Sequence, residues 1–298
     1  MIKRLLGAVL SRQGSSIIDG ASDPRINDID RLLFKNLPLS ARSDVQLFDP
    51  ILKRHGCLRS TANFSSEEKF DLNQWFQYKE KAEVALSVAT CWPGGDYFEF
   101  GSTDVNTFRN LLTAYDIYNL DARFPDTRFY AFDIFGKTSE MNDKTRAMVE
   151  GTPGYADYMN CFSARGDLLE ENLNYLRDHG LFVDRCHLIQ GYFEETLTHD
   201  FKKSLMKEGR QIGFACLDCN IAPPYKIVFE FIFELMAPIS YIYMDEYTSG
   251  SVQIYLEQFR TALREKRNMG MYYVRNAAGF GGLVGLYPLG SGIPPLEL

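Results

Sequence analysis

Short apolar runs alternate with amphipathic stretches along the chain from residue 96 onward. The amphipathic stretches have the residue spacing of helices and cover 104–118, 165–179 and 223–236. The apolar runs are rich in aromatic and β-branched residues and lie at 97–100, 129–132, 186–190, 212–217 and 240–244. Strands that alternate with helices in this way predict a parallel sheet covered by helices on both faces.

The end of the chain departs from this alternation. Two further apolar runs, 271–275 and 282–287, are separated only by a glycine-rich loop, so they predict an antiparallel hairpin. Five alternating units followed by a hairpin are the layout of a class I methyltransferase. The predicted fold class is therefore α/β, with a Rossmann-like, mostly parallel sheet and an antiparallel terminal hairpin.

The first 90 residues have a different character. They are polar and interrupted, and Ser65 or Ser66 followed by acidic residues is the capping pattern of a helix start. We expect residues 1–90 to form an N-terminal helical cap on a domain that spans residues 91–298. Within that domain, the polar and aromatic stretch 136–164 is expected to be an insertion that acts as a lid.

Composition limits the kinds of binding partner and the cellular compartment that we expect for the protein. The net charge of −7 argues against a nucleic-acid partner, because phosphate binding needs a basic face. The apolar part of "MIKRLLGAVL" is too short for a signal peptide, and no run approaches the ~20 residues of a membrane span. The six cysteines are scattered, and the lone pair Cys216 and Cys219 lacks the second pair of a zinc site. We expect a cytoplasmic protein with buried, reduced thiols.

The loop after the first strand, in "YFEFGSTDVNTF", is the first indication of a ligand. A dinucleotide needs several glycines at this turn, whereas this loop has only Gly101, and Asp104 would repel a phosphate. S-adenosylmethionine (SAM) carries an ammonium and a sulfonium group, and Glu99 would favour both, directly or through water. Gly101, Ser102 and Thr103 would then line the cofactor. The alternative is a strand followed by a capped helix with no ligand.

Two further strand ends offer cofactor contacts. The second strand ends in Asp133, whose carboxylate would accept hydrogen bonds from a ribose diol. After the third strand, Tyr192 and Phe193 are placed to flank an adenine ring. An aspartate that only stabilises a turn is the alternative for Asp133.

The fourth and fifth strands end in acidic residues, Asp218 in "FACLDCN" and Asp245-Glu246 in "YIYMDEY". Adjacent strand tips would bring the three carboxylates together, where like charges repel. A divalent cation with oxygen ligands, Mg²⁺, would resolve this repulsion and could acidify an acceptor hydroxyl. In the alternative, Asp218 only positions the cofactor or substrate, and Asp245 and Glu246 cap the next helix.

These motifs, in this order, resemble the macrocin and mycinamicin sugar O-methyltransferases, the TylF-type family of class I SAM-dependent enzymes. The resemblance covers about residues 94–250 and includes "YFEFG", "FYAFDIFG", "IQGYFEETL", "LDCN" and "MDEY". It implies that SAM binds around Glu99, Gly101 and Asp133. It also implies that Mg²⁺ is held by the carboxylates of the fourth and fifth strands, and that the methyl group goes to a sugar hydroxyl.

The sequence departs from the family in three places. The first loop lacks further glycines, and Asn220 stands where the family has a second acid. The family's catalytic base is a histidine near the C-terminus, whereas the four histidines here are at 55, 179, 187 and 199. We expect His187 to be structural and His199 to face solvent. The proton of the acceptor would then pass to Asp218, Glu246 or water.

The leading hypothesis is a Mg²⁺-assisted O-methyltransferase that acts on a sugar hydroxyl of a glycan or natural product. One alternative is a methyltransferase for a phenol, an amine or a peptide. Another is a degenerate SAM-fold protein that binds a partner without catalysis. The aromatic content of 14% is compatible with a homodimer.

Overall fold

The computed structural model describes residues 84–102, 105–135, 168–178, 181–276 and 281–290, together with 146, 147, 150 and 151. Residues 84–90 are helical. The elements that follow are β1 (Asp96–Phe100), α5 (Asn106–Ile117), the 3₁₀ helix η1 (Leu120–Ala122), β2 (Phe129–Asp133), α8 (Leu169–Asp178), the 3₁₀ helix η2 (Val183–Arg185), β3 (Cys186–Gln190), α9 (Phe193–Thr196), α10 (His199–Lys207), β4 (Ile212–Leu217), α11 (Ala222–Ile232), β5 (Met236–Met244), α12 (Gly250–Arg267), β6 (Met269–Asn276) and β7 (Gly282–Pro288).

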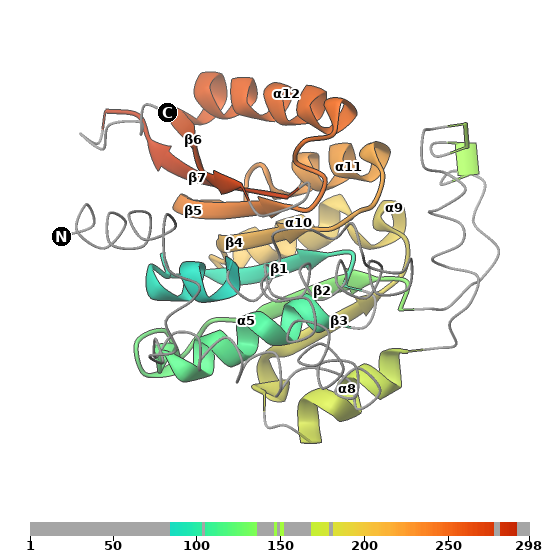
Figure 1. Cartoon of the computed structure of the whole chain (residues 1–298), viewed down its shortest axis with the longest axis vertical. Helices are drawn as coiled ribbons and strands as arrows, with labels where there is room; N and C mark the ends of the chain where they lie inside the picture. Colours follow the sequence, from blue (N-terminus) through green and yellow to red (C-terminus); the bar gives the residue numbers. More distant parts are fainter. Residues whose placement is uncertain are drawn as a thin grey trace, which may run out of the picture.

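The strands form one seven-stranded sheet in the order β3-β2-β1-β4-β5-β7-β6 (Figure 1). β1 to β5 pair in parallel, and β7 runs antiparallel to both of its neighbours. This confirms the predicted mostly parallel α/β sheet with a terminal hairpin. The chain order reverses between β1 and β4, and ligands of open α/β sheets bind at such a switch point, beyond the carboxyl ends of the strands.

Each face of the sheet has its own apolar core, because successive side chains of a strand point to opposite faces. On one face, Tyr97 of β1 stacks on Phe108 of α5 with ring centroids 5.6 Å apart, and α8 packs nearby. On the other face, Phe98 and Phe100 belong to a core built with α10, α11 and α12. The two layers of helices can be followed in Figure 1. The strands are thereby packed between two layers of helices, which holds their ends in fixed positions.

The bounds of β1 to β4 differ from the predicted runs by at most one residue, whereas β5 corrects the prediction. The predicted helix over 223–236 ends at Ile232, and β5 begins at Met236 rather than at residue 240. Met236 is fully buried and pairs with Ile212 at the start of β4. Residues 233–235 form the turn between α11 and β5, and pairing with β4 places the chain in the sheet from Met236 onward.

The predicted elements include no helix between β5 and the hairpin, yet α12 occupies this stretch. Its buried residues are Val252, Leu256, Phe259 and Leu263. These positions repeat every three or four residues, which is the spacing of one helix face. The signal was present in the sequence, and α12 covers the sheet beside α11.

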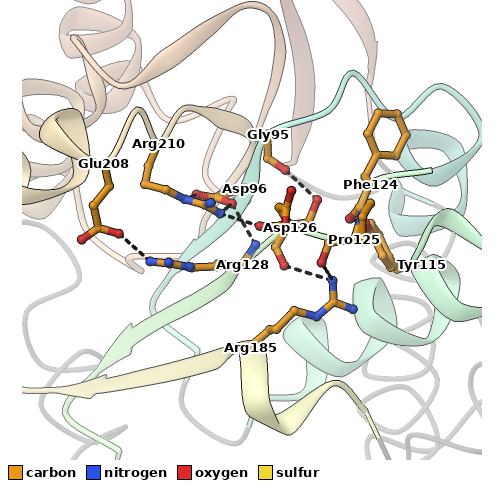
Figure 2. Close-up of polar contacts among 11 residues, drawn as sticks. Gly95, Asp96, Tyr115, Phe124, Pro125, Asp126, Arg128, Arg185, Glu208 and Arg210 are labelled. Atoms are coloured by element: carbon orange, nitrogen blue, oxygen red, sulfur yellow. Dashed lines mark hydrogen bonds and ion pairs between the residues drawn. The ribbon is translucent and has the colours of Figure 1, made fainter. Parts of the chain in front are cut away.

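A polar network fixes the amino ends of β1 and β2 (Figure 2). Asp96, the first residue of β1, is 1% exposed. Its carboxylate accepts two hydrogen bonds from the Arg210 guanidinium, one from Nε to Oδ2 at 2.7 Å and one from Nη2 to Oδ1. Arg210 also donates to the carbonyl oxygen of Asp126 at 2.8 Å. The backbone N–H of Arg128 donates to Asp96 at 2.8 Å, and its guanidinium pairs with Glu208 at 2.7 Å.

A second arginine holds the loop that leads into β2. Arg185 of η2 donates to the carbonyl oxygen of Pro125 at 2.6 Å and to the carboxylate of Asp121 at 2.5 Å. The hydroxyl of Tyr115 donates to the carbonyl oxygen of Phe124 at 2.6 Å. These contacts lie at the end of the sheet opposite to the carboxyl ends of the strands, so they support the strands without occupying the ligand edge.

Several predictions concern residues outside the described ranges. They are most of the cap (1–90), most of the insertion (136–164), and Thr103. The division into a cap and a domain, and the lid, therefore stay predictions. In the described part of the chain, no helix combines the length and the apolar character that crossing a membrane requires.

Candidate active site

Backbone hydrogen bonds continue the sheet past the ends of three neighbouring strands. The N–H of Gly101 donates to the carbonyl oxygen of Phe132, and the N–H of Asp218 donates to that of Phe100, both at 2.9 Å. The N–H of Asp245 donates to the carbonyl oxygen of Leu217 at 2.9 Å. The first residues after β1, β4 and β5 therefore lie in register, and the sheet brings three of the predicted site segments to one edge.

The backbone of Asp218 leaves no space for a side chain at the single glycine of the first loop. Gly101 has φ +90°, and a β-carbon there would lie 1.8 Å from the carbonyl oxygen of Asp218. The next residue, Ser102, is 4% exposed, and its hydroxyl has no hydrogen-bond partner within the described part of the chain. A buried hydroxyl normally has a partner, so its position beside the switch point suits a polar ligand.

The same loop holds a strained residue that sequence reasoning did not single out. Val105 precedes α5 with φ 51° and is fully buried. A left-handed backbone is unfavourable for a β-branched residue, and such strain is found at ligand-binding loops. The N–H of Val105 donates to the carbonyl oxygen of Ser102 at 2.6 Å, which closes the tight turn between β1 and α5.

Glu99, predicted to face the cofactor, is 1% exposed near the end of β1. It accepts a hydrogen bond from the hydroxyl of Tyr97, two residues earlier on the same face of the strand. Burial raises the pKa of Tyr97 well above its ordinary value, and the charge of Glu99 adds to this effect. Tyr97 therefore stays a hydrogen-bond donor, and it orients the carboxylate. The spacing Tyr-x-Glu on a strand is the signal for this pair.

Asp133 ends β2 as predicted and is 8% exposed. One oxygen, Oδ1, accepts the N–H of Phe135 at 2.7 Å, so the carboxylate stabilises the turn after the strand. The carbonyl oxygen of Asp133 accepts the N–H of Gly191, which joins the ends of β2 and β3. The turn role considered from the sequence is thus present, and it holds the carboxylate at the strand tip.

The two aromatic residues after β3 have different surroundings. Tyr192 precedes α9 and is half-buried. Phe193 meets the ring of Phe100 edge-on at 6.0 Å and packs against the core on the α10–α12 face. This packing accounts for Phe193 without a ligand, so Tyr192 is the better candidate for an adenine contact. Both assignments stay predictions.

The three acids predicted to meet at the tips of β4 and β5 do so. Asp218, Asp245 and Glu246 each offer a carboxylate oxygen, and these oxygens all lie within 4.8 Å of one another. All three side chains are half-buried. Their oxygens are the kind of donor that Mg²⁺ prefers, so the donor set and its compactness fit a divalent cation.

The alternative role of Asp245 and Glu246 as helix caps does not hold. α12 begins only at Gly250, its N-cap is Ser249, and no acid lies in its first turn. The N–H of Ser249 donates to the backbone carbonyl oxygen of Glu246 at 2.9 Å. The two acids therefore belong to the turn that ends β5.

Two tyrosines hold the acids that follow β5. Tyr243 donates to Oδ1 of Asp245 at 2.8 Å, and Tyr225 of α11 donates to the carboxylate of Glu246. Burial raises the pKa of Tyr225 well above its ordinary value, with the charge of Glu246 next in effect. Tyr225 is therefore a protonated donor. Neither tyrosine was predicted as a site residue, although Tyr243 shows the same Tyr-x-acid spacing as β1.

The cysteine pair of "CLDC" forms no disulfide bond in the described part of the chain, which agrees with the predicted thiols. Both Cys216 and Cys219 are buried. Burial raises the pKa of Cys219 well above its ordinary value, and the charges of Glu246, Asp218 and Asp133 act in the same direction. Carboxylates from the tips of β2, β4 and β5 therefore all act on one thiol.

The two histidines in the described ranges lie away from these acids. His187, on β3, stacks on Tyr130 with ring centroids 4.7 Å apart. Burial lowers the pKa of His187, and the charge of Arg128 lowers it further. Arg128 lies at the amino ends of the strands, whereas the acids lie at their carboxyl ends. His199 is exposed at the start of α10. His187 thus has a packing role, and His55 and His179 lie outside the described residues.

Comparison with known proteins gives its clearest result for the fold. No family model matches the chain, and no curated protein matches it. The structure of the calicheamicin methyltransferase CalS11 matches with a TM-score of 0.52 at 18% identity, over 91% of this chain and 98% of that chain.

Two further solved structures are more distant. The O-methyltransferase NovP has a TM-score of 0.47 at 14% identity, over 70% of this chain and 78% of its own. TomG from Streptomyces achromogenes, an O-methyltransferase of tomaymycin synthesis solved with SAM, has a TM-score of 0.44 at 12% identity, over 97% and 100%. The match to CalS11 agrees with the resemblance drawn from the motifs, and the chain has the Rossmann-like fold of class I methyltransferases.

Proposed function

We propose that the protein is a SAM-dependent, Mg²⁺-assisted O-methyltransferase that acts on a sugar hydroxyl of a glycan or natural product. The observation that carries the proposal is the row of strand tips, in which Gly101, Asp218 and Asp245 follow β1, β4 and β5 in register. CalS11, whose fold the chain shares, is a calicheamicin methyltransferase. The motifs along the same strands resemble those of sugar O-methyltransferases.

The β1–β2 side of this edge suits SAM. Glu99 and Asp133 place carboxylates at two neighbouring strand tips, where they favour a cationic ligand. The hydroxyl of Ser102 offers a buried polar contact, and Tyr192 offers a ring for the adenine. The loop after Gly101 lacks the glycines that a pyrophosphate needs, which distinguishes this cofactor from a dinucleotide.

The β4–β5 side suits the cation. Asp218, Asp245 and Glu246 would hold Mg²⁺, because three carboxylates this close repel one another unless a positive charge joins them. A bound Mg²⁺ would supply a Lewis acid that orients and acidifies the acceptor hydroxyl. Asp218 lies beside Gly101, so the two binding regions are adjacent.

The chain's own residues have two tasks in methyl transfer. They must align the acceptor oxygen with the methyl carbon, which the sulfonium activates, and they must take up the acceptor's proton. Asp218 and Glu246 are the candidates for accepting this proton, directly or through water. Tyr225 keeps Glu246 in place while it does so.

The test is calorimetric titration of SAM and its demethylated product into the protein, with and without Mg²⁺. Asp133→Asn is the informative variant, because it removes the charge and retains the oxygen that accepts the N–H of Phe135. We expect weaker SAM binding in Asp133→Asn and unchanged binding in Asp200→Asn, which removes an exposed charge from α10. Wild-type protein that binds neither ligand would overturn the proposal.

The acceptor class needs a separate experiment. Transfer of labelled methyl groups is measured with sugars, phenols, amines and peptides as acceptors. We expect Mg²⁺-dependent transfer to a sugar. Transfer only to another class would select the alternative acceptor, and SAM binding without any transfer would select a non-catalytic binding protein.

We further propose a cytoplasmic location and a homodimer. The four described cysteines, 91, 186, 216 and 219, form no disulfide bonds, which suits a reducing compartment. Fractionation of the native cells tests the first proposal, and sedimentation velocity tests the second.

A further inference from the structure

Tyr225 occupies the junction between the two strand tips that carry the three acids. It is fully buried on α11, and its ring lies 6.0 Å from that of Phe229. Its hydroxyl lies 3.1 Å from the carbonyl oxygen of Leu217, the last residue of β4, and bonds to the carboxylate of Glu246 beyond β5. One side chain on a helix thus contacts both strand ends.

Local sequence explains how α11 brings Tyr225 to this junction. Asn220 has φ 61°, a left-handed conformation that asparagine tolerates better than most residues, and it turns the chain after Asp218. Pro223 and Pro224 follow in the first turn of α11, where proline's fixed φ suits the start of a helix. Tyr225 then comes in the first turn, on the buried face of the helix.

The hydroxyl of Tyr225 belongs to a hydrogen-bond network that joins the ends of β4 and β5. The carbonyl oxygen of Leu217 accepts the N–H of Asp245 at 2.9 Å and faces the hydroxyl of Tyr225. The same hydroxyl accepts the N–H of Glu246 at 3.4 Å. The residue before Asp218 and the two acids after β5 are therefore linked through one carbonyl oxygen and one hydroxyl. Loss of the hydroxyl would remove one contact that fixes the rotamer of the Glu246 side chain.

We propose that Tyr225 is a positioning residue whose hydroxyl sets the geometry of the Asp218, Asp245 and Glu246 carboxylates for a divalent cation. The inference rests on the proposed cation site, and it assigns a role to a residue that the proposed reaction does not itself require. Tyr225 does not itself touch the reacting atoms. It acts only through Glu246 and through the spacing of the two strand tips.

The test compares Tyr225→Phe with wild type and with Tyr115→Phe. The control also removes the hydroxyl of a fully buried tyrosine, but that hydroxyl bonds to the carbonyl oxygen of Phe124, away from the acids. Binding of Mn²⁺, a probe for the Mg²⁺ site, is followed by electron paramagnetic resonance without SAM or acceptor. SAM affinity is measured by calorimetry on the same preparations.

We expect Tyr225→Phe to weaken Mn²⁺ binding about tenfold, as loss of a group that orients a metal ligand does, and to leave SAM affinity within about twofold. Tyr115→Phe should change neither affinity. In a Glu246→Gln background, Tyr225→Phe should have a smaller further effect, because one of its two routes, the Glu246 carboxylate, is already altered. Para-aminophenylalanine at position 225 keeps a donor and should restore binding.

Three results would overturn the inference. The first is wild-type Mn²⁺ affinity in Tyr225→Phe, which leaves the proposed cation site standing. The second is loss of helical signal in circular dichroism, which would place the hydroxyl in fold stability alone. The third is a wild-type protein that binds SAM but no Mn²⁺, which would remove the cation from the proposed function as well.

Discussion

The carbonyl oxygen of Asp218 occupies the space beside Gly101 that a side chain would need. A β-carbon on Gly101 would lie 1.8 Å from that oxygen, and the glycine's φ of +90° is itself unfavourable for other residues. The loop after β1 and the tip of β4 are therefore in van der Waals contact through backbone atoms. This contact joins the proposed cofactor loop to the first of the three acids, so a change in one must displace the other.

Gly101→Ala should therefore be more damaging than an alanine at another left-handed glycine. The backbone conformation costs about 1–2 kcal/mol, and the steric conflict adds roughly 1–3 kcal/mol. The matched control is Gly209→Ala, where φ is +69° and nothing lies within 4 Å of the new β-carbon. Urea unfolding measures the free-energy difference, and calorimetry measures SAM binding. Equal destabilisation of the two variants would contradict the contact.

Asp218→Asn should separate charge from shape in the acid cluster. The amide has nearly the same size, so the fold should persist while Mn²⁺ affinity falls by at least about tenfold. In the cation-free protein, relief of repulsion should raise the free energy of unfolding by roughly 1 kcal/mol. Asp200→Asn, an exposed acid of α10, is the control for a general charge effect. Unchanged Mn²⁺ affinity in Asp218→Asn would exclude this residue as a ligand.

Arg210→Met should destabilise the fold by about 3–5 kcal/mol, because it leaves the carboxylate of Asp96 buried without its partner. Asp96→Asn/Arg210→Met should lose much less, since no buried charge remains. The two variants are compared by urea unfolding. Similar losses in both would mean that packing of the Arg210 side chain, rather than charge, stabilises this end of the sheet.

The same pair should affect the pH dependence of stability. Burial raises the pKa of Asp96 above its ordinary value of 3.8, and Arg210 opposes this rise. A carboxyl whose pKa is raised by folding contributes full stability below pH 3.8 and loses it as pH rises through the folded pKa. In Arg210→Met the folded pKa should rise further, so the loss should extend to higher pH. Unfolding free energies measured across the acidic to neutral range test this slope.

His187→Gln should leave the proposed methyl transfer unchanged, because His187 stacks on Tyr130 and lies away from the acids. Burial lowers the pKa of His187 below its ordinary value of 6.5. Its contribution to stability is therefore complete above pH 6.5 and is lost as pH falls through the folded pKa. The variant should show a weaker loss of stability on acidification. A fall in activity with unchanged stability would instead give His187 a catalytic role.

The α/β class was predictable because the signals that define it are local. Each of β1 to β4 is a short, mostly apolar run; β1, β2 and β4 are fully buried, and β3, with the least aromatic composition, is half-buried. The end of α11 was not predictable in the same way. Residues 233–235 form a turn, and only the pairing of Met236 with Ile212 shows that the strand begins there rather than at residue 240.

The acids of the site were also predictable, since each ends a recognisable strand and parallel strands end at one edge. Their supporting donors were not. Tyr225 precedes Glu246 by 21 residues, and nothing in the spacing reveals the bond. Likewise, Gly101 was identified as a turn residue, but the carbonyl oxygen of Asp218 that excludes a side chain belongs to another strand.

The sequence by itself determined where β1 to β4 lie, which acids follow the strands and which cofactor chemistry the first loop excludes, because these depend on neighbours along the chain. Only the tertiary structure decided which hydroxyls orient those acids and how closely the strand tips approach. Such contacts join positions far apart in sequence, and their geometry arises from the packing of α11 and the strands together.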